Sequence, residues 1–283
     1  MSGPRGTADA VEAADAETRV QAYWERVVGS GRPLHFLVTH PRELLAAARD
    51  TRRLPRVDAV LTGAPAGALM RKELERRTKL GLPLGTTGVC HLEVPAVSAD
   101  YSLGRSKQTL RRKARAATKL GVTWRVVTDT AEQAELTRRL DAHLPQKKDS
   151  RYRQVGSDHS YMVGSGLWAV AEDADGVPLV VAVTPYDGEW AILRLFIALG
   201  DEQKHSDARY LLTQGVVETL SARGVRHLFD NRAPHELTNG LRHFQRMLGF
   251  GLVRVRPVAA APAPVRELPV PGARTDADLE RVG

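Results

Sequence analysis

The groups best suited to acid–base chemistry in this sequence stand at the ends of predicted elements. Asp230 follows the apolar run 225–229, Glu236 lies in the next loop, and His205 opens a long amphipathic pattern. Carboxylates and imidazoles take protons from nucleophiles in general acid–base catalysis. Because functional residues gather at strand ends in α/β proteins, Asp230 ranks first among these, and His235 is a further candidate. The structural alternative for Asp230 is a turn with no catalytic role.

Three residues near the predicted strands are candidates to line a binding cleft. Arg194 interrupts the apolar run AILRLFIAL, Trp168 lies on a neighbouring strand, and Arg232 follows Asp230 in the loop. An arginine among apolar side chains is costly unless it is paired. Arg194 therefore either meets an acidic side chain or binds the carboxylate of a ligand, and the sequence leaves both open.

The positive charge of the chain is concentrated in its middle. Lys and Arg number 41 against 33 Asp and Glu, which gives a net charge of +8 and a pI near 9.9. Residues 105–153 alone hold 14 basic and 5 acidic residues, a local net charge of +9. Arg111, Arg115 and Lys119 recur at a spacing of four within a predicted helix over 106–120. These cations indicate a phosphate-rich partner, with a solvated helix face as the alternative.

The elements that would position these groups alternate between helix and strand. Apolar spacing predicts a helix-and-strand region up to residue 127 and then a three-stranded meander that leads into helix, strand, short helix and strand. This alternation predicts an α/β (α+β) fold, with a mixed sheet flanked by helices. The predicted helices cover 17–28, 66–80, 106–120 and 205–223, and two more contain residues 44–48 and 241–248. The predicted strands cover 35–38, 57–61, 86–94, 122–127, 225–229, 250–255 and three segments of 167–199.

Composition excludes several kinds of protein. No apolar run approaches the roughly 20 residues that span a bilayer, and the N-terminal residues lack the apolar core of a signal sequence. A cytoplasmic location is therefore expected. The single cysteine, Cys90, cannot form an internal disulfide, and the nine histidines are scattered, so no metal site is expected.

The order of elements from the meander onward resembles the acetyltransferase (GNAT) fold. In that family the loop before the central helix reads Gln/Arg-x-x-Gly-x-Gly/Ala and binds the pyrophosphate of acyl-coenzyme A. Gln203 and Ala208 match that pattern, whereas Ser206 replaces a glycine and Asp207 adds a negative charge beside the phosphates. These departures favour another branch of the same fold.

That branch is the Fem-type aminoacyltransferases, which the segment GLRHFQRMLGF resembles. Their C-terminal element often reads Gly-Leu-x-x-Phe-Lys-x-x-x-Gly-Phe, and Gln245 stands here in place of the lysine, whose charge Arg242 or Arg246 would supply. Two acetyltransferase-like halves are fused in those enzymes. The resemblance thus implies a degenerate half over 17–125 and a catalytic half over 126–256, between a flexible tail at 1–16 and an Ala/Pro-rich tail at 257–283. The matching residues are Gly240, Leu241, Phe244, Gly249 and Phe250.

The resemblance implies an aminoacyltransferase that moves an aminoacyl group from aminoacyl-tRNA to an amine of a small-molecule or peptide acceptor. An acyl-coenzyme-A-dependent N-acyltransferase is the alternative, and a nucleic-acid-binding module without catalysis would explain only the charge. Either donor would be a co-substrate, so no tightly bound cofactor is expected. Trp168, Arg194 and Arg232 would bind the acceptor. The donor-binding set would comprise Arg111, Arg112, Arg115, Lys119, Lys147, Lys148, Gln203, Ser206, Arg242 and Arg246.

Overall fold

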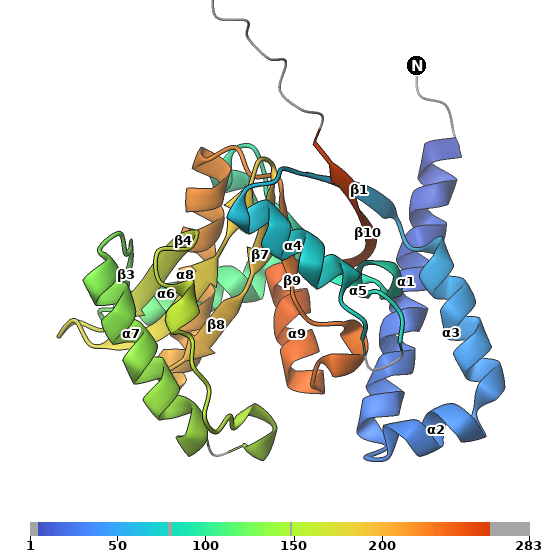
Figure 1. Ribbon diagram of the computed structural model, residues 1–283, viewed down its shortest axis with the longest axis horizontal. Helices are drawn as coiled ribbons and strands as arrows, with labels where there is room; N and C mark the ends of the chain where they lie inside the picture. The colour runs from blue at the N-terminus through green and yellow to red at the C-terminus, as the bar shows by residue number, and fades with distance from the viewer. Residues whose placement is uncertain (1–4, 79–80, 148, 261–283) are drawn as a thin grey trace, which may run out of the picture.

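Two sheets form the centre of the protein, whose computed structural model describes residues 5–78, 81–147 and 149–260 (Figure 1). The strands are β1 (Arg56–Leu61), β2 (Val89–Glu93), β3 (Thr123–Val126), β4 (Leu167–Glu172), β5 (Pro178–Thr184), β6 (Tyr186–Asp187), β7 (Trp190–Leu193), β8 (Leu195–Ala198), β9 (His227–Asp230) and β10 (Gly251–Ala259). In the described residues a six-stranded sheet has the order β1-β10-β2-β9-β7-β6, and a four-stranded antiparallel sheet has the order β3-β4-β5-β8. The first sheet is mixed, because β1 runs parallel to β10 and β7 parallel to β9. The expected mixed α/β architecture is confirmed.

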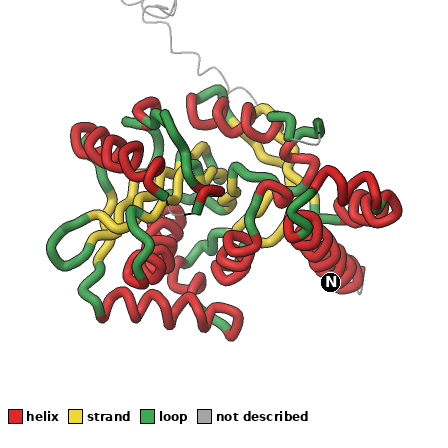
Figure 2. The backbone as a smooth tube through the Cα atoms, turned by 90° about the horizontal axis from the view of Figure 1, so that it is seen from below, coloured by secondary structure: helices red, strands yellow, loops and turns green. Residues whose placement is uncertain are grey.

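Helices cover these sheets, and Figure 2 shows the strands inside a surrounding layer of helices. The helices are α1 (Arg5–Gly29), α2 (Pro33–Thr39), α3 (Pro41–Arg53), α4 (Pro65–Glu75), α5 (Leu84–Thr87), α6 (Gln108–Lys119), α7 (Thr130–His143), α8 (Gln203–Ala222) and α9 (Asn239–Leu248). One apolar cluster joins α4 and α5 to the six-stranded sheet, a second joins α7 to the four-stranded sheet, and the largest joins α1, α8 and α9 to both. None of the helices in the described part of the chain combines the length and apolarity of a membrane-spanning segment.

Arg194 is the single residue between β7 and β8, where the chain passes from the six-stranded sheet to the four-stranded sheet. β7 ends at Leu193 in the six-stranded sheet, and β8 begins at Leu195 in the four-stranded sheet, where it pairs with β5. β7 pairs with β9, whereas β8 pairs with β5, so the two sheets diverge after Arg194. Helix α8 starts shortly after β8 and returns the chain to β9. The end of β9 and the start of α8 therefore flank the divergence.

Several sequence expectations were wrong in detail. Residues 35–38 were expected as a strand but lie in helix α2, because Pro33 occupies the first helical turn, where its fixed φ favours a helix. The third strand predicted in the segment 167–199 is interrupted at Arg194, which divides it into β7 and β8. Helix α1 already begins at Arg5, within the predicted N-terminal tail, and β10 extends to Ala259. The six-stranded sheet takes strands from both sides of the predicted boundary at residue 125.

Gly85 provides a test of the contact between α5 and β10. A Cβ at this position would overlap the backbone carbonyl oxygen of Val255, which cannot move without displacing the strand. Gly85→Ala is therefore expected to lower the free energy of unfolding by about 1–3 kcal/mol. Gly240→Ala is the matched control, because a Cβ there meets nothing within 4 Å on helix α9. Urea denaturation should show a loss for the first variant and no loss for the second, and equal stability of both would contradict this packing.

Candidate functional site

Asp230 ends strand β9 and is enclosed, with 7% of its surface exposed. Its Oδ1 accepts a hydrogen bond from the backbone N–H of Arg232 at 2.9 Å, and its Oδ2 accepts one from Nε2 of Gln245 at 2.7 Å. Burial raises the pKa of Asp230 to about 6, because the charge of Arg232 and these hydrogen bonds offset only part of the lost hydration. A carboxyl group with this pKa exchanges its proton near neutral pH, as a general base must.

Arg194 lies directly beside the end of β9. Because parallel pairing sets Leu193 opposite Asp230, Arg194 falls next to Asn231. Its Nη1 pairs with Glu73 of α4 at 2.9 Å. With its amide oxygen turned toward Arg194, Asn231 accepts from the same nitrogen at 2.9 Å and donates to Asp230 at 3.2 Å. Of the two alternatives predicted for Arg194, the structure shows the ion pair.

Glu236, the second base candidate, holds the loop after β9 in place. Its Oε2 accepts from the backbone N–H of Ala233 at 3.0 Å and faces Nη2 of Arg76 at 3.5 Å. Arg76 also donates to the carbonyl of Asn231 at 2.9 Å. Burial opposes ionisation, but the Ala233 N–H and Arg76 outweigh it and lower the pKa of Glu236. A carboxylate stabilised as the anion is a weaker base than Asp230.

His205, the third base candidate, lies in the first turn of α8 with 8% of its surface exposed. Burial lowers the pKa of its imidazole, so the ring is neutral at physiological pH. Its Nδ1 has no hydrogen-bond partner among the described residues, and neither has Nε2 of the neighbouring His143. Buried polar atoms are rarely left unpaired, so these nitrogens mark a place where a polar ligand group or water would be held.

Two half-buried cations lie beside these imidazoles. Lys147 donates to the carbonyl of Ala198 at 2.7 Å and faces Asp201 at 3.6 Å. The guanidinium of Arg209 lies 4.3 Å from the centre of the Phe244 ring and forms no ion pair within the described part of the chain. Burial lowers the pKa of both basic groups. We call Lys147 and Arg209, with the neutral imidazoles of His143 and His205 beside them, the cation cluster; a phosphate or carboxylate would neutralise the charge of Arg209.

Asp207 was expected to place a negative charge beside any phosphate bound at the start of α8, and the structure corrects this. The carboxylate is buried, with 4% of its surface exposed. Its Oδ1 accepts from Nζ of Lys113 on α6 at 2.8 Å and from Nε2 of Gln203 at 2.7 Å. Lys113 therefore neutralises the Asp207 carboxylate, and the side-chain amide of Gln203 is hydrogen-bonded to that same carboxylate. Ser206 is half-buried, and its backbone N–H donates to the carbonyl of Glu202 at 3.2 Å.

The cations around α6 fall into two groups. Residues 101–128 contain eight Lys and Arg residues and no acid. One group is held by the protein itself: Lys107 on the carbonyl of Leu248, Arg111 on those of Ser102 and Gly104, Lys113 on Asp207, and Arg125 on Glu132 and Glu172. The side chains of the other group form no ion pair or hydrogen bond with the residues that the structure describes. This second group is Arg105, Arg112, Arg115 and Lys119.

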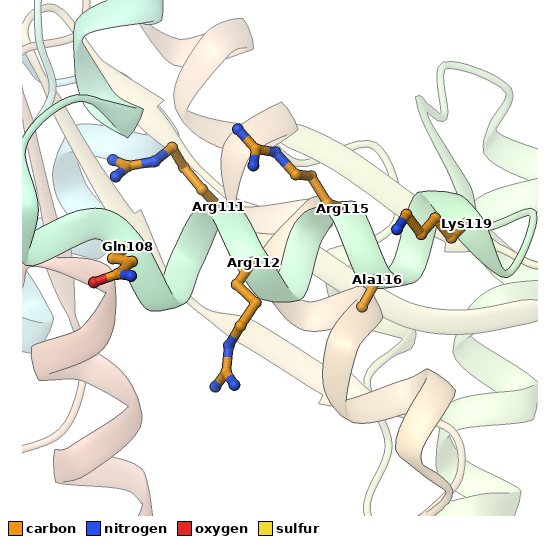
Figure 3. Close-up of a pocket in the computed structure, with 6 residues that line it drawn as sticks. All are labelled: Gln108, Arg111, Arg112, Arg115, Ala116 and Lys119. Atoms are coloured by element: carbon orange, nitrogen blue, oxygen red, sulfur yellow. The ribbon is translucent and has the colours of Figure 1, made fainter.

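An open groove of about 620 Å³ runs along α6 beside the unpaired cations (Figure 3). Arg111 and Arg115 project from one side of the helix and Arg112 from the other. A second hollow of about 410 Å³ lies where Leu211 and Gln214 of α8 meet α6. The groove residues are Gln108, Arg111, Arg112, Arg115, Ala116 and Lys119.

The remaining predicted ligand contacts lie elsewhere. Trp168 was expected along a cleft, but it is 1% exposed in the core beneath α7, where its Nε1 donates to the carbonyl of Met162 at 3.2 Å.

Arg242 is buried and donates to the carbonyls of Pro234 and Trp24, and Arg246 pairs with Glu25 at 3.0 Å. The guanidinium of Arg232 has no partner in the described residues and lies beside Asp230. Lys148 lies outside the described residues.

Sequence reasoning missed a histidine–aspartate pair near Arg194. His159 donates from its backbone N–H to Asp141 at 3.0 Å, and its Nδ1 lies 2.5 Å from the other carboxylate oxygen. The neighbouring Tyr161 ring stacks 6.4 Å away, and its hydroxyl accepts from Arg194 at 3.4 Å. The two partners are 18 residues apart across an irregular loop, so no sequence spacing signals them.

Comparison with known proteins finds only distant likeness. No family model and no curated protein matches the sequence. Similar solved structures are L-PGS from Bacillus licheniformis (15% identity, TM-score 0.43), FemX (9%, 0.46) and a GCN5-related N-acetyltransferase from Sphaerobacter thermophilus (13%, 0.31). The matches cover 58%, 59% and 69% of this chain and 58%, 60% and 58% of theirs, so the chain spans less than two thirds of their length. FemX and an acetyltransferase are the kinds of protein that the sequence resembles.

Proposed function

We propose that the protein is an acyltransferase that takes an aminoacyl group from aminoacyl-tRNA and delivers it to an amine. The observation that carries this proposal is the row of unpaired cations on α6. Arg112, Arg115 and Lys119 span about 10 Å along the helix at 1.5 Å per residue. A nucleic-acid strand carries one phosphate per roughly 3.4 Å of axis, so the row matches about three phosphates. An isolated small donor would not require a row of that length.

The basic row leads toward the start of α8. Lys113 of α6 binds Asp207, so α6 lies against the first turns of α8. The cation cluster occupies the same end of α8, where Lys147 pairs with Asp201 and Arg209 has no acidic partner among the described residues. A chain of phosphates that follows α6 would thereby be guided to the divergence of the two sheets. Asp230 lies at that divergence, on the neighbouring strand β9.

Asp230 is assigned the role of general base. The acceptor ammonium gives up a proton, and the free amine attacks the ester carbonyl of the aminoacyl group. The new C–N bond forms as the ester C–O bond breaks, and the ribose oxygen leaves with a proton. Gln245 and Asn231 orient the Asp230 carboxylate through hydrogen bonds. Glu73 holds Arg194 in place, which keeps Asn231 beside Asp230.

An acyl-coenzyme-A donor is the second candidate, and one observation favours it. Because Lys113 neutralises Asp207, the start of α8 does not repel a pyrophosphate as the sequence suggested. The cation cluster would accept the phosphates of coenzyme A equally well. The difference between the donors therefore rests on the α6 row, which coenzyme A would leave largely uncovered.

Calorimetric titration separates the two donors. We expect tRNA to bind the protein with a steep salt dependence, and acetyl-coenzyme A to bind at least 100-fold more weakly at the same ionic strength. Uncharged tRNA serves as the probe, because it has the same phosphates as aminoacyl-tRNA and no aminoacyl ester that could hydrolyse during the titration. Tight binding of acetyl-coenzyme A without measurable tRNA binding would reject the tRNA-dependent reaction and leave the acyl-coenzyme-A-dependent one.

A further inference from the structure

Helix α2 is an apolar helix without a buried residue. Its sequence is PLHFLVT, and none of its residues is buried. Leu34 and Val38, one helical turn apart, expose 76% and 79% of their surfaces, and Leu45 on the adjoining helix α3 exposes 70%. Among the described large apolar side chains, only Val155 is more exposed, at 83%. Leu34 and Val38 therefore share the outer face of α2, and Leu45 is exposed on the helix that follows directly in the chain.

This segment stands at one end of the molecule. Figure 1 shows α2 joining the ends of α1 and α3, far from both sheets. Phe36 holds it to the body, because its ring lies 6.3 Å from that of Tyr23 and stacks at 4.2 Å on His40. The side chain of Phe36 thus packs against α1, whereas Leu34 and Val38 remain exposed to solvent. We call Leu34, Val38 and Leu45 the apolar tip.

Two exposed arginines flank helix α2 in the chain. Arg32 precedes α2 and Arg42 follows it, and both are exposed without an ion pair in the described part of the chain. Helix α2 carries no acid, and the carboxylate of Glu43 is taken by Arg26 at 3.0 Å. An apolar surface flanked by unpaired arginines fits the boundary of a bilayer that contains anionic lipid, where the side chains enter the hydrocarbon edge and the guanidinium groups meet phosphate.

A second copy of the chain fits this surface less well. A two-fold contact would bring two such arginine-flanked surfaces together, and helix α2 carries no acid to pair with them. Stable protein interfaces bury about 800 Å² on each partner, far more than three side chains offer. From charge and size together, we propose that the apolar tip docks the protein on the surface of an anionic membrane. This proposal stands independently of the donor and of the catalytic residues.

Vesicle sedimentation tests the proposal. The full chain is mixed with vesicles of phosphatidylcholine alone or with 30% phosphatidylglycerol, in the absence of RNA. We expect binding to the anionic vesicles and at least tenfold weaker binding after Leu34→Ser together with Val38→Ser. The matched control is Val97→Ser with Val155→Ser, because these side chains are also exposed, at 60% and 83%, but lie elsewhere. The control should bind as the unchanged protein does.

A labelled cysteine reports the geometry directly. Cys90 is buried, so Leu34→Cys introduces one reactive thiol for a polarity-sensitive fluorophore, and Val155→Cys provides the comparison. A blue shift at position 34 but not at 155 on anionic vesicles is expected. No vesicle binding, or equal binding by the Leu34→Ser, Val38→Ser variant, would overturn the proposal, the latter because the α6 cations would then account for it. Concentration-dependent dimerisation abolished by the same variant would instead assign the tip to a second copy.

Discussion

Asp230→Asn is expected to abolish transfer and at the same time to make the folded protein more stable above neutral pH. The folded pKa of about 6 lies above the ordinary value of 3.8, so the fold favours the protonated carboxyl group. The contribution of Asp230 to stability is therefore complete below about pH 4 and is lost as the pH rises through about 6. At pH 8 the ionised group costs the fold about 3 kcal/mol, since one pKa unit corresponds to roughly 1.4 kcal/mol.

Asparagine keeps the shape of the side chain and removes this penalty. Its carbonyl oxygen can still accept from the N–H of Arg232, and its amide can donate to Oε1 of Gln245, which has no partner in the described structure. Urea denaturation should show the variant more stable by about 2–3 kcal/mol at pH 8, with the gain falling to about 1 kcal/mol at pH 4.5. Asp100→Asn, at an exposed position, is the control and should match the unchanged protein at both values.

The catalytic consequence has the opposite sign. An amide cannot take a proton from the acceptor amine, so the transfer rate should fall by about 10²–10⁴-fold while donor binding is retained. Gain of stability with loss of activity distinguishes a catalytic carboxylate from a structural one. An Asp230→Asn variant that is less stable at pH 8 but fully active would show that Asp230 only maintains the fold.

Replacing Arg112, Arg115 and Lys119 together by Gln is expected to weaken tRNA binding roughly 10- to 100-fold and to reduce the slope of log K against log salt by about 2–3. All three residues belong to the unpaired group on α6, and glutamine has a helix propensity close to that of arginine and lysine. Arg111 is left intact, because it holds the carbonyls of Ser102 and Gly104. Filter binding at several salt concentrations gives both quantities.

A charge-matched variant controls for net charge. Arg49, Arg52 and Lys72 are exposed and lie on α3 and α4, and their replacement by Gln removes the same three charges. This variant should keep the salt slope and nearly all of the affinity. If both triple variants lose affinity equally, the attraction is a property of the whole positive surface and the groove along α6 has no special part.

The strongest sequence predictions concerned elements whose side chains repeat with a clear period. Helix α8, strand β9 and helix α9 were predicted within a few residues, because their apolar residues form single faces and glycines end them. Arg194 was predicted to be either paired or ligand-bound because an arginine in an apolar run is costly. The raised pKa of Asp230 was not predictable, since it depends on burial by segments distant in the sequence, including Gln245 of α9.

Long-range pairing set the limits of sequence reasoning. The pair of Glu73 with Arg194 joins α4 to the junction of β7 and β8, and no local pattern connects them. Lys113 and Asp207 are likewise 94 residues apart, so Asp207 read alone suggested a repulsive charge. Helix α2 was mistaken for a strand because four apolar residues in a short run fit either structure, and Pro33 decided the outcome.

Transfer itself tests the central claim most directly. The protein is incubated with tRNA carrying a radiolabelled aminoacyl group, or with labelled acetyl-coenzyme A, and with a panel of amines and peptides that have free amino groups. We predict labelled amide product from aminoacyl-tRNA, lost in Asp230→Asn and reduced in the Arg112, Arg115, Lys119 variant. Amide product from acetyl-coenzyme A, with none from aminoacyl-tRNA across the same acceptors, would contradict the assignment.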